Sequence, residues 1–168
     1  MLTFERLGYA HASAVSDFIK KQHATIINGF FSPPTVGIIG MALKKDKGLS
    51  LGAFDNNVLV GIRLTYFPGT TEHNHGYDLR FSQDELMQVA QFHGTLVKED
   101  KRYKGIGYEL VKKNCDEIFK AGYGIILATV HPENEASLKM VLKNGFEPKK
   151  LVTKYGGLPR IILEKRNS

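Results

Sequence analysis

Apolar and polar residues alternate along Leu2–Leu7, a pattern that is typical of a strand with one buried face. From Ala10 to about Ala24 the apolar residues recur at helical spacing instead, so we expect a helix there. The segment FFSPP then interrupts the chain, and Pro34 suits the first turn of a second helix that would run to about Lys45. The N-terminal part therefore predicts one strand followed by two helices.

A β-hairpin is expected next. Two stretches rich in strand-forming residues, LSLGAF and VLVGIRLTYF, flank the turn-forming sequence Asp-Asn-Asn at residues 55–57. A polar loop follows at Pro68–Asp78, and Ser82 with Glu85 three residues later has the spacing of a capping box. We therefore expect a short helix to begin after Ser82.

The C-terminal half alternates strands with helices. Ala90–Val97 is typical of a strand, and residues 108–121 carry the apolar stripe of a helix, with Cys115 on its buried side. Ile125–Val130 is a continuous apolar run, which indicates a strand buried on both faces. Another helix is expected from Asn134 to about Gly145, and two last strands, KKLVTKY and RIILEK, are separated by the turn sequence GGLP.

The predicted order is β-α-α-β-β-(α)-β-α-β-α-β-β, which indicates a mixed α/β fold. We expect about seven strands in one central, mostly antiparallel sheet, flanked by about four helices. One β-α-β unit runs from Ala90 to Val130 and has Arg102–Gly107 at its strand-to-helix turn. A chain of 168 residues is expected to form a single domain, residues 1–168.

Composition narrows the choice of partner and compartment. The formal net charge of +6 allows an anionic partner, but the basic residues are spread along the chain, which favours a small anion over nucleic acid. No apolar run approaches the roughly 20 residues that span a bilayer, and no signal peptide or membrane binding is expected. Cys115 is the only cysteine, which suits a reducing, cytoplasmic location.

The sequence RYKGIGYEL, Arg102–Leu110, places two glycines at the predicted strand-to-helix turn. Such a turn directs several backbone N–H groups and the positive end of a helix dipole at one point, which suits a phosphate or pyrophosphate. The dinucleotide fingerprint fails because its third glycine would stand at Leu110, and the chain contains no P-loop sequence. A glycine-rich turn without any ligand is the alternative.

The wider stretch VKEDKRYKGIGYELVKKNCDEIF resembles the signature of the GNAT superfamily of N-acetyltransferases, in which Arg/Gln-x-x-Gly-x-Gly/Ala leads from a strand into a helix. A second family landmark resembles IILATVHPENEASLKMVLKNGF, with Asn134 and Gly145-Phe146 in place. The β-α-α-β-β order upstream is also similar, so the resemblance covers nearly the whole chain. It implies a single GNAT-like domain that acetylates an amine with acetyl-CoA, an acyltransferase of groups other than aminoacyl groups.

Carried over by position, the resemblance implies how coenzyme A is held. Backbone N–H groups from Arg102 through Tyr108 would bind the pyrophosphate, and the strand end at Leu96 and Val97 would pair with the pantetheine amides. Asn134 would face the pantetheine arm, although it also suits a plain helix N-cap. The expected set is Leu96, Val97, Arg102, Tyr103, Lys104, Gly105, Ile106, Gly107, Tyr108 and Asn134.

Acetyl transfer requires a neutral amine, a polarised thioester and a stabilised leaving thiolate. Many family members supply an acid from a tyrosine four residues before the Gly-Phe pair, but Val141 stands there, so the general acid is unknown. Tyr155 and Tyr77 are loose candidates. For the general base, strand alternation puts Gln91 and His93 on one face, and only His93 can accept a proton. A structural, half-buried histidine is the alternative.

Other readings of the chain stay open. A non-catalytic CoA-binding or sensing module is favoured by Val141, and a nucleic-acid-binding domain is suggested by charge alone. His73 and His75 lack a third metal ligand at a suitable spacing, so no metal is expected and a polar loop is preferred. Phe30 and Phe31 suit either the acceptor site or the core. The acceptor and the oligomeric state, a homodimer included, are not determined by the sequence.

Overall fold

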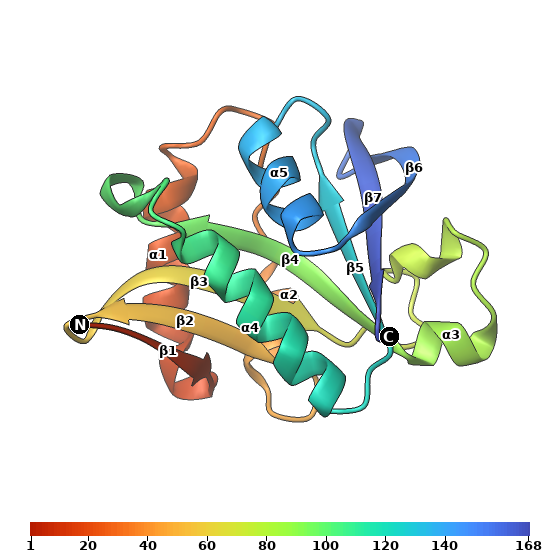
Figure 1. Ribbon diagram of the computed structural model, residues 1–168, viewed down its shortest axis with the longest axis horizontal. Helices are drawn as coiled ribbons and strands as arrows, with labels where there is room; N and C mark the ends of the chain where they lie inside the picture. The colour runs from red at the N-terminus through yellow and green to blue at the C-terminus, as the bar shows by residue number, and fades with distance from the viewer.

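Seven strands form a single sheet in the order β1-β2-β3-β4-β5-β7-β6 (Figure 1) in the computed structural model, which covers residues 1–168. Every neighbouring pair is antiparallel except β4 and β5, which are parallel. The mixed, mostly antiparallel sheet that the sequence predicts is confirmed. The strands are β1 (Leu2–Leu7), β2 (Ser50–Asp55), β3 (Val58–Tyr66), β4 (Val89–Val97), β5 (Ile125–Val130), β6 (Glu147–Lys154) and β7 (Leu158–Arg166).

The structure contains five α-helices, where about four were expected. The fifth is the short helix that the sequence predicts after Ser82, and its capping box is confirmed, since the Ser82 hydroxyl accepts from the N–H of Glu85. None of the helices is long and apolar enough to span a membrane. The helices are α1 (Ala12–His23), α2 (Val36–Leu43), α3 (Gln83–Met87), α4 (Ile106–Lys120) and α5 (Glu135–Lys143), and three 3₁₀ turns occupy Tyr9–His11, His75–Tyr77 and Glu99–Lys101.

Helix α2 is shorter than the sequence indicated. Thr35 is its N-cap, and the Thr35 side-chain oxygen accepts from the N–H of Ile38 at 3.2 Å. A capping hydroxyl can satisfy a first-turn N–H group, which a proline ring cannot do. Pro34 therefore lies outside the helix, and placing it in the first turn was wrong. The helix also ends at Leu43 rather than near Lys45.

The predicted hairpin is confirmed and is closed by a two-residue turn. Asn56 and Asn57 have φ angles of 49° and 68°, so both adopt the left-handed conformation. Tight hairpin turns require this conformation, and asparagine tolerates it better than most residues. The turn sets the register of β2 against β3, and with it the face of the sheet on which each β3 side chain lies.

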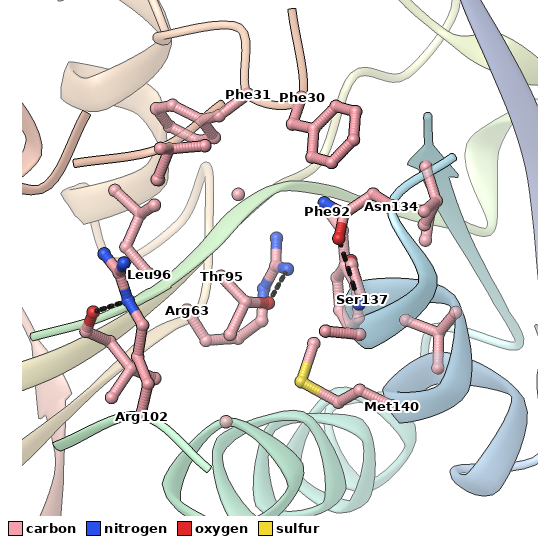
Figure 2. Close-up of a pocket in the computed structure, with 18 of the residues that line it drawn as sticks. Phe30, Phe31, Arg63, Phe92, Thr95, Leu96, Arg102, Asn134, Ser137 and Met140 are labelled. Carbon is pink, nitrogen blue, oxygen red and sulfur yellow. Dashed lines mark hydrogen bonds between the residues drawn. The ribbon is translucent and has the colours of Figure 1, made fainter. Parts of the chain in front are cut away.

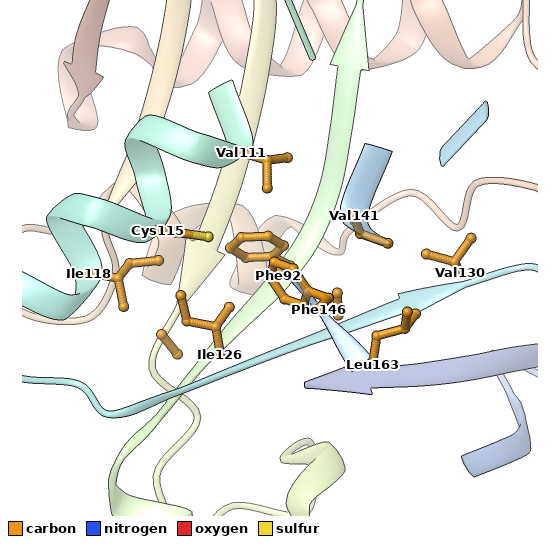
Figure 3. Packing of buried hydrophobic residues seen from close by; sticks show 11 residues of the cluster. Phe92, Val111, Cys115, Ile118, Ile126, Val130, Val141, Phe146 and Leu163 are labelled. Atoms are coloured by element: carbon orange, nitrogen blue, oxygen red, sulfur yellow. The ribbon is translucent and has the colours of Figure 1, made fainter. Parts of the chain in front are cut away.

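Helices α1 and α2 cover one face of the sheet and α4 covers the other (Figure 1). On the α1–α2 side, Val15 packs in one buried cluster with Ile62 and Leu64 of β3. On the α4 side, Cys115 packs in a second cluster with Phe92 of β4 (Figure 3). Because side chains alternate along a strand, the residue between Ile62 and Leu64 points to the α4 side.

Strands β4 and β5 pair only at their beginnings, where residues 89–91 lie against residues 125–127. Beyond Gln91 the two strands diverge, and β5 continues to pair with β7. Strand β4 also carries a bulge, since Thr65 pairs with Phe92 while Arg63 pairs with Thr95, which leaves one extra residue in β4. The edge of β4 that faces β5 is therefore without a strand partner from Phe92 onward.

Candidate active site

A cavity of about 630 Å³ opens in the gap between β4 and β5 (Figure 2). Its walls come from the end of β4, the turn before α4, the first part of α5, and the segment that follows α1. His93 and every residue of the expected CoA-binding set except Lys104 line this one cavity. The structure thus brings most of residues 93–108 together with Asn134, which follows the next strand of the chain.

The turn before α4 presents unpaired backbone donors to the cavity. Gly105 is the N-cap, and its φ of +82° is a left-handed conformation that glycine adopts without strain. The N–H groups of Tyr103, Lys104 and Gly105 find no acceptor in the protein. The next three N–H groups belong to the first helical turn, which an α-helix leaves unpaired. A Cβ atom at Gly105 would meet no atom within 4 Å, so space is open there.

Arg102 secures this turn rather than pointing freely into the cavity. Its Nε donates to the carbonyl of Val97 at 2.9 Å, and a terminal nitrogen donates to the Thr25 hydroxyl at 2.7 Å. The backbone N–H of Arg102 donates to the carbonyl of Glu99 at 3.4 Å. The turn is therefore tied to the end of β4 and to the end of α1.

Gly107 faces helix α5. A Cβ atom at this position would lie 2.9 Å from Sδ of Met140 on α5, so a side chain here would require the end of the flexible Met140 side chain to move. The two glycines that look alike in the sequence thus have different surroundings: one faces open space and the other faces a neighbouring helix.

The unpartnered edge of β4 presents backbone groups to the cavity. The N–H of Lys98 donates to the carbonyl of Val60 at 2.8 Å, so the backbone groups of Lys98 face β3. Because backbone groups alternate along a strand, those of Leu96 also face β3, while those of Val97 and Thr95 face the cavity. Of the two strand-end residues expected to pair with a ligand, only Val97 has its backbone on that side.

Asn134 caps α5 and lines the cavity at the same time. Its Oδ1 accepts from the N–H of Ser137 at 3.3 Å (Figure 2), which is the ordinary N-cap bond. The cap fixes the first turn of α5 against the opening between the strands.

Aromatic and polar side chains line the opposite end of the cavity, beside Phe30 and Phe31. Tyr155 lies here, with its hydroxyl 3.2 Å from the Thr129 hydroxyl, and burial raises its pKa. Tyr77 lies outside the cavity, and its hydroxyl donates to the carbonyl of Thr70. Of the two tyrosines that the sequence offered as acids, only Tyr155 is placed at the site.

His93 is held in its neutral form. Its Nε2 lies 3.0 Å from the carbonyl oxygen of Ser32, so this nitrogen carries the proton and donates. Burial lowers the pKa of His93 to about 4, and the positive charge of Arg63 adds to the effect. At neutral pH the ring is therefore uncharged, and its proton affinity is far below that of an alkyl amine.

Family comparison decides what kind of protein has this site. The model of the acetyltransferase (GNAT) family matches residues 31–146, which is more than half of the chain. The chain belongs to this family. The GNAT resemblance of the glycine turn and of Asn134 with Gly145-Phe146 is thereby confirmed, and no curated protein matches the chain by sequence.

Solved structures similar to this GNAT chain share its fold. The ribosomal-protein-S18-alanine N-acetyltransferase from Escherichia coli aligns with a TM-score of 0.71 at 16% identity, over 99% of this chain and 94% of that one. A protein described as an acetyltransferase from Salmonella typhimurium, solved with its cofactor acetyl-CoA, aligns with a TM-score of 0.74 at 15% sequence identity. The alignment covers 99% of this chain and 94% of that one. An aminoglycoside acetyltransferase in complex with coenzyme A and kanamycin aligns with a TM-score of 0.72 at 16% sequence identity. The alignment covers 99% of this chain and 95% of that one. Together with the family match, these structures support acetyl transfer.

Gln91, which the sequence places on the same face of β4 as His93, has a structural role. Its side-chain nitrogen donates to the Tyr66 hydroxyl at 2.8 Å and to the carbonyl of His73 at 2.7 Å. Its oxygen accepts from the N–H of His75 at 2.8 Å. These bonds fix the 68–78 loop against the sheet, and no group of three or more possible metal-ligating side chains occurs in the structure.

Sequence reasoning missed Arg63, a charged residue of the GNAT cavity. Arg63 lies on β3 between Ile62 and Leu64, so its side chain points to the α4 side and reaches the cavity (Figure 2). The signal in the sequence was a single charged residue within the apolar run VLVGIRLTYF. Only the strand register shows that this residue points inward, toward Thr95 and Phe92.

Proposed function

We propose that this protein is an N-acetyltransferase that transfers the acetyl group of acetyl-CoA directly to an amine. The observation that carries the proposal is the β4 edge at Thr95 and Val97, which has no strand partner, next to unpaired N–H groups at the start of α4. Along this edge the carbonyl of Val97 already accepts from Nε of Arg102. An extended arm with amide groups can add to such an edge as a further strand. A pyrophosphate at the end of that arm suits a helix N-terminus.

In this proposal the chain divides the binding of acetyl-CoA among several residues. The N–H groups of residues 103–108 bind the pyrophosphate, with Gly105 leaving the approach open. Arg102 positions the turn through Val97 and Thr25 rather than meeting the phosphates. Asn134 lies along the path of the pantetheine arm. Bound acetyl-CoA supplies an activated acetyl group on a thioester.

The amine would reach the thioester from the end of the cavity that holds Phe31, His93 and Tyr155. A histidine with a pKa near 4 accepts a hydrogen bond but does not keep an amine's proton at neutral pH. The proposal is therefore that His93 orients the amine through Nδ1, which has no partner in the protein, and that the proton passes to water.

A screen of amines with acetyl-CoA, monitored by release of free thiol, tests the proposal. Wild-type protein should release one thiol for each acetylated amine, and the acetylated product should appear by mass spectrometry. Val141→Tyr, which restores the tyrosine that many relatives carry, is a useful companion variant. Wild-type protein that binds acetyl-CoA but releases no thiol with any amine of a broad panel would contradict the proposed activity.

A second candidate function is a CoA-binding or sensing module without catalysis. It is favoured by Val141, which is buried at the position of the missing tyrosine and offers no proton donor. This candidate predicts the same affinity for CoA and acetyl-CoA, together with thiol release no faster than in buffer. The amine screen thus separates the two functions.

A further inference from the structure

A buried guanidinium group stands in the cavity. Arg63 is only 3% exposed, and its guanidinium carbon lies 3.7 Å from the centre of the Phe92 ring. One terminal nitrogen donates to the Thr95 hydroxyl at 2.5 Å, and the other donates to the carbonyl of Leu64. Figure 2 shows the group beside Thr95 in the interior of the cavity.

The charge of Arg63 is not compensated by the protein. No carboxylate pairs with it, and its Nε is buried without any hydrogen-bond partner. Burial lowers the pKa of Arg63 to about 9, which still leaves the group charged at neutral pH. Burying a charge without a partner is costly, and an opposite charge in the cavity would offset that cost.

The position of Arg63 on β3, opposite Thr95 of β4, places its side chain along the cavity. It pairs with Thr95, one of the residues whose backbone faces the cavity, and its guanidinium stacks on Phe92. Phe92 is the first residue beyond the paired part of β4 and β5, so it marks the closed end of the gap. An arm that starts at the α4 turn and follows this edge inward ends beside Phe92, and therefore beside the guanidinium.

The neighbouring wall of the cavity is apolar. Val141 is 3% exposed and belongs to the same buried cluster as Phe92 and Phe146 (Figure 3). The GNAT resemblance implies an acidic tyrosine at this position, and valine offers no proton donor, so another group is needed to meet the charge that develops on sulfur. Arg63 places a charged group directly on the Phe92 ring.

We propose that Arg63 stabilises the thiolate that leaves when acetyl-CoA gives up its acetyl group. This role rests on the proposed function. The amine nitrogen forms a bond to the thioester carbon, the C–S bond breaks, and its electron pair goes to sulfur. The ammonium proton passes to water, and the guanidinium charge balances the thiolate until it is protonated and released.

The thiol pKa of bound coenzyme A tests this role without any knowledge of the acceptor. A free thiol titrates near pH 8.5, and an opposite charge close by lowers such a pKa by about 1–3 units. The thiolate absorbs in the ultraviolet, so its absorbance can be followed from pH 5.5 to 9 in the complex of wild-type protein with CoA. We expect a bound thiol pKa at least one unit below that of free CoA.

Variants give the matched comparison. Arg63→Met should return the bound thiol pKa to the value of free CoA or above it, while CoA affinity stays within a few-fold. Arg160→Met is the control, because Arg160 is another buried arginine of the cavity that lies near an aromatic ring, at the acceptor end. It should leave the thiol pKa lowered.

Three outcomes separate this role from the proposed function. CoA that binds wild-type protein with an unshifted thiol pKa overturns the role of Arg63, even if Arg63→Met does not fold. A lowered pKa that persists in Arg63→Met overturns it as well. Wild-type protein that binds no CoA contradicts the proposed function itself, and it also overturns the role of Arg63 in stabilising the thiolate.

Discussion

Residues that look alike in the sequence are separated by their surroundings. Gly105 and Gly107 stand two apart, but only Gly105 has a positive φ and open space beside it, while Gly107 touches Met140. His75 is buried and His93 is partly buried, and loss of hydration lowers the pKa of each to about 4. For His75, the nearby charge of Lys154 acts in the same direction. The pattern of residue types alone distinguishes none of these cases.

His75 and His93 predict a specific pH dependence of stability. Their folded-state pKa values, about 4, lie below the value of 6.5 expected in the unfolded chain. Between pH 4 and pH 6.5 the unfolded chain binds more protons than the folded protein. The contribution of the two neutral histidines to the free energy of unfolding is therefore complete above pH 6.5 and is lost as the pH falls toward 4. We expect the free energy of unfolding to drop by roughly 2–4 kcal/mol between pH 7 and pH 5.

Urea denaturation at a series of pH values measures this drop. His75→Gln should remove about half of it, because the two histidines have similar pKa values. A free energy of unfolding that is constant from pH 7 to pH 5 would show that these side chains are accessible to protons in the folded protein.

Strand β4 is the element that shapes the site. Its first residues pair with β5, its bulge lies at His93-Gly94, and its end presents an unpartnered edge to the cavity. Gly94 has a φ of +98°, and a Cβ atom there would lie 2.6 Å from Cε1 of Phe31. The bulge thus depends on contact with the segment that follows α1, which is distant in the sequence.

Replacement of Gly94 tests how firmly this bulge is fixed. Gly94→Ala combines backbone strain, about 1–2 kcal/mol, with a steric clash against Phe31 that costs about 1–3 kcal/mol more. Gly156→Ala is the matched control, because Gly156 has a φ of +76° and no atom within 4 Å of a Cβ. Equal losses of unfolding free energy in the two variants would contradict the close packing of Phe31 on β4.

The sequence predicts correctly those elements whose conformation depends on the residues of the element itself. The apolar run Ile125–Val130 and the turn at Asn56-Asn57 are confirmed because burial and turn conformation follow directly from residue type. The bulge at Gly94 and the divergence of β4 from β5 arise from contacts between distant segments, so no local pattern contains them. The inward direction of Arg63 was hidden for the same reason, since it depends on strand register.

The distribution of charge over the whole molecule also bears on the acceptor. The chain carries a formal net charge of +6, and the cavity is lined by Arg63, Arg102, Lys101 and Arg160 but by only one acidic residue, Glu135. Lys101 is paired with Asp55 at 3.2 Å, whereas Arg160 donates only to backbone carbonyls. The electrostatic potential at the end of the cavity that holds His93, Tyr155 and Arg160 is therefore positive.

This positive potential predicts that polycations are poor acceptors. A second ammonium about 7 Å from an unpaired guanidinium is repelled by roughly 2 kcal/mol, which is more than a tenfold effect. Free-thiol release should therefore give a kcat/KM at least tenfold lower for spermidine or kanamycin than for monoamines that are otherwise neutral or carry a carboxylate. A preference for spermidine over all monoamines would contradict this reading of the site.

The central claim, that the gap between β4 and β5 holds acetyl-CoA, is tested most directly by calorimetric titration of wild-type protein, Gly105→Val and Gly122→Val. Gly105 and Gly122 flank the two ends of α4, both have positive φ and open space, and only Gly105 lines the cavity. We predict saturation at one acetyl-CoA per chain for wild-type protein and Gly122→Val, and binding at least tenfold weaker for Gly105→Val. No saturable heat with wild-type protein, or equal affinity in the two variants, would contradict the account.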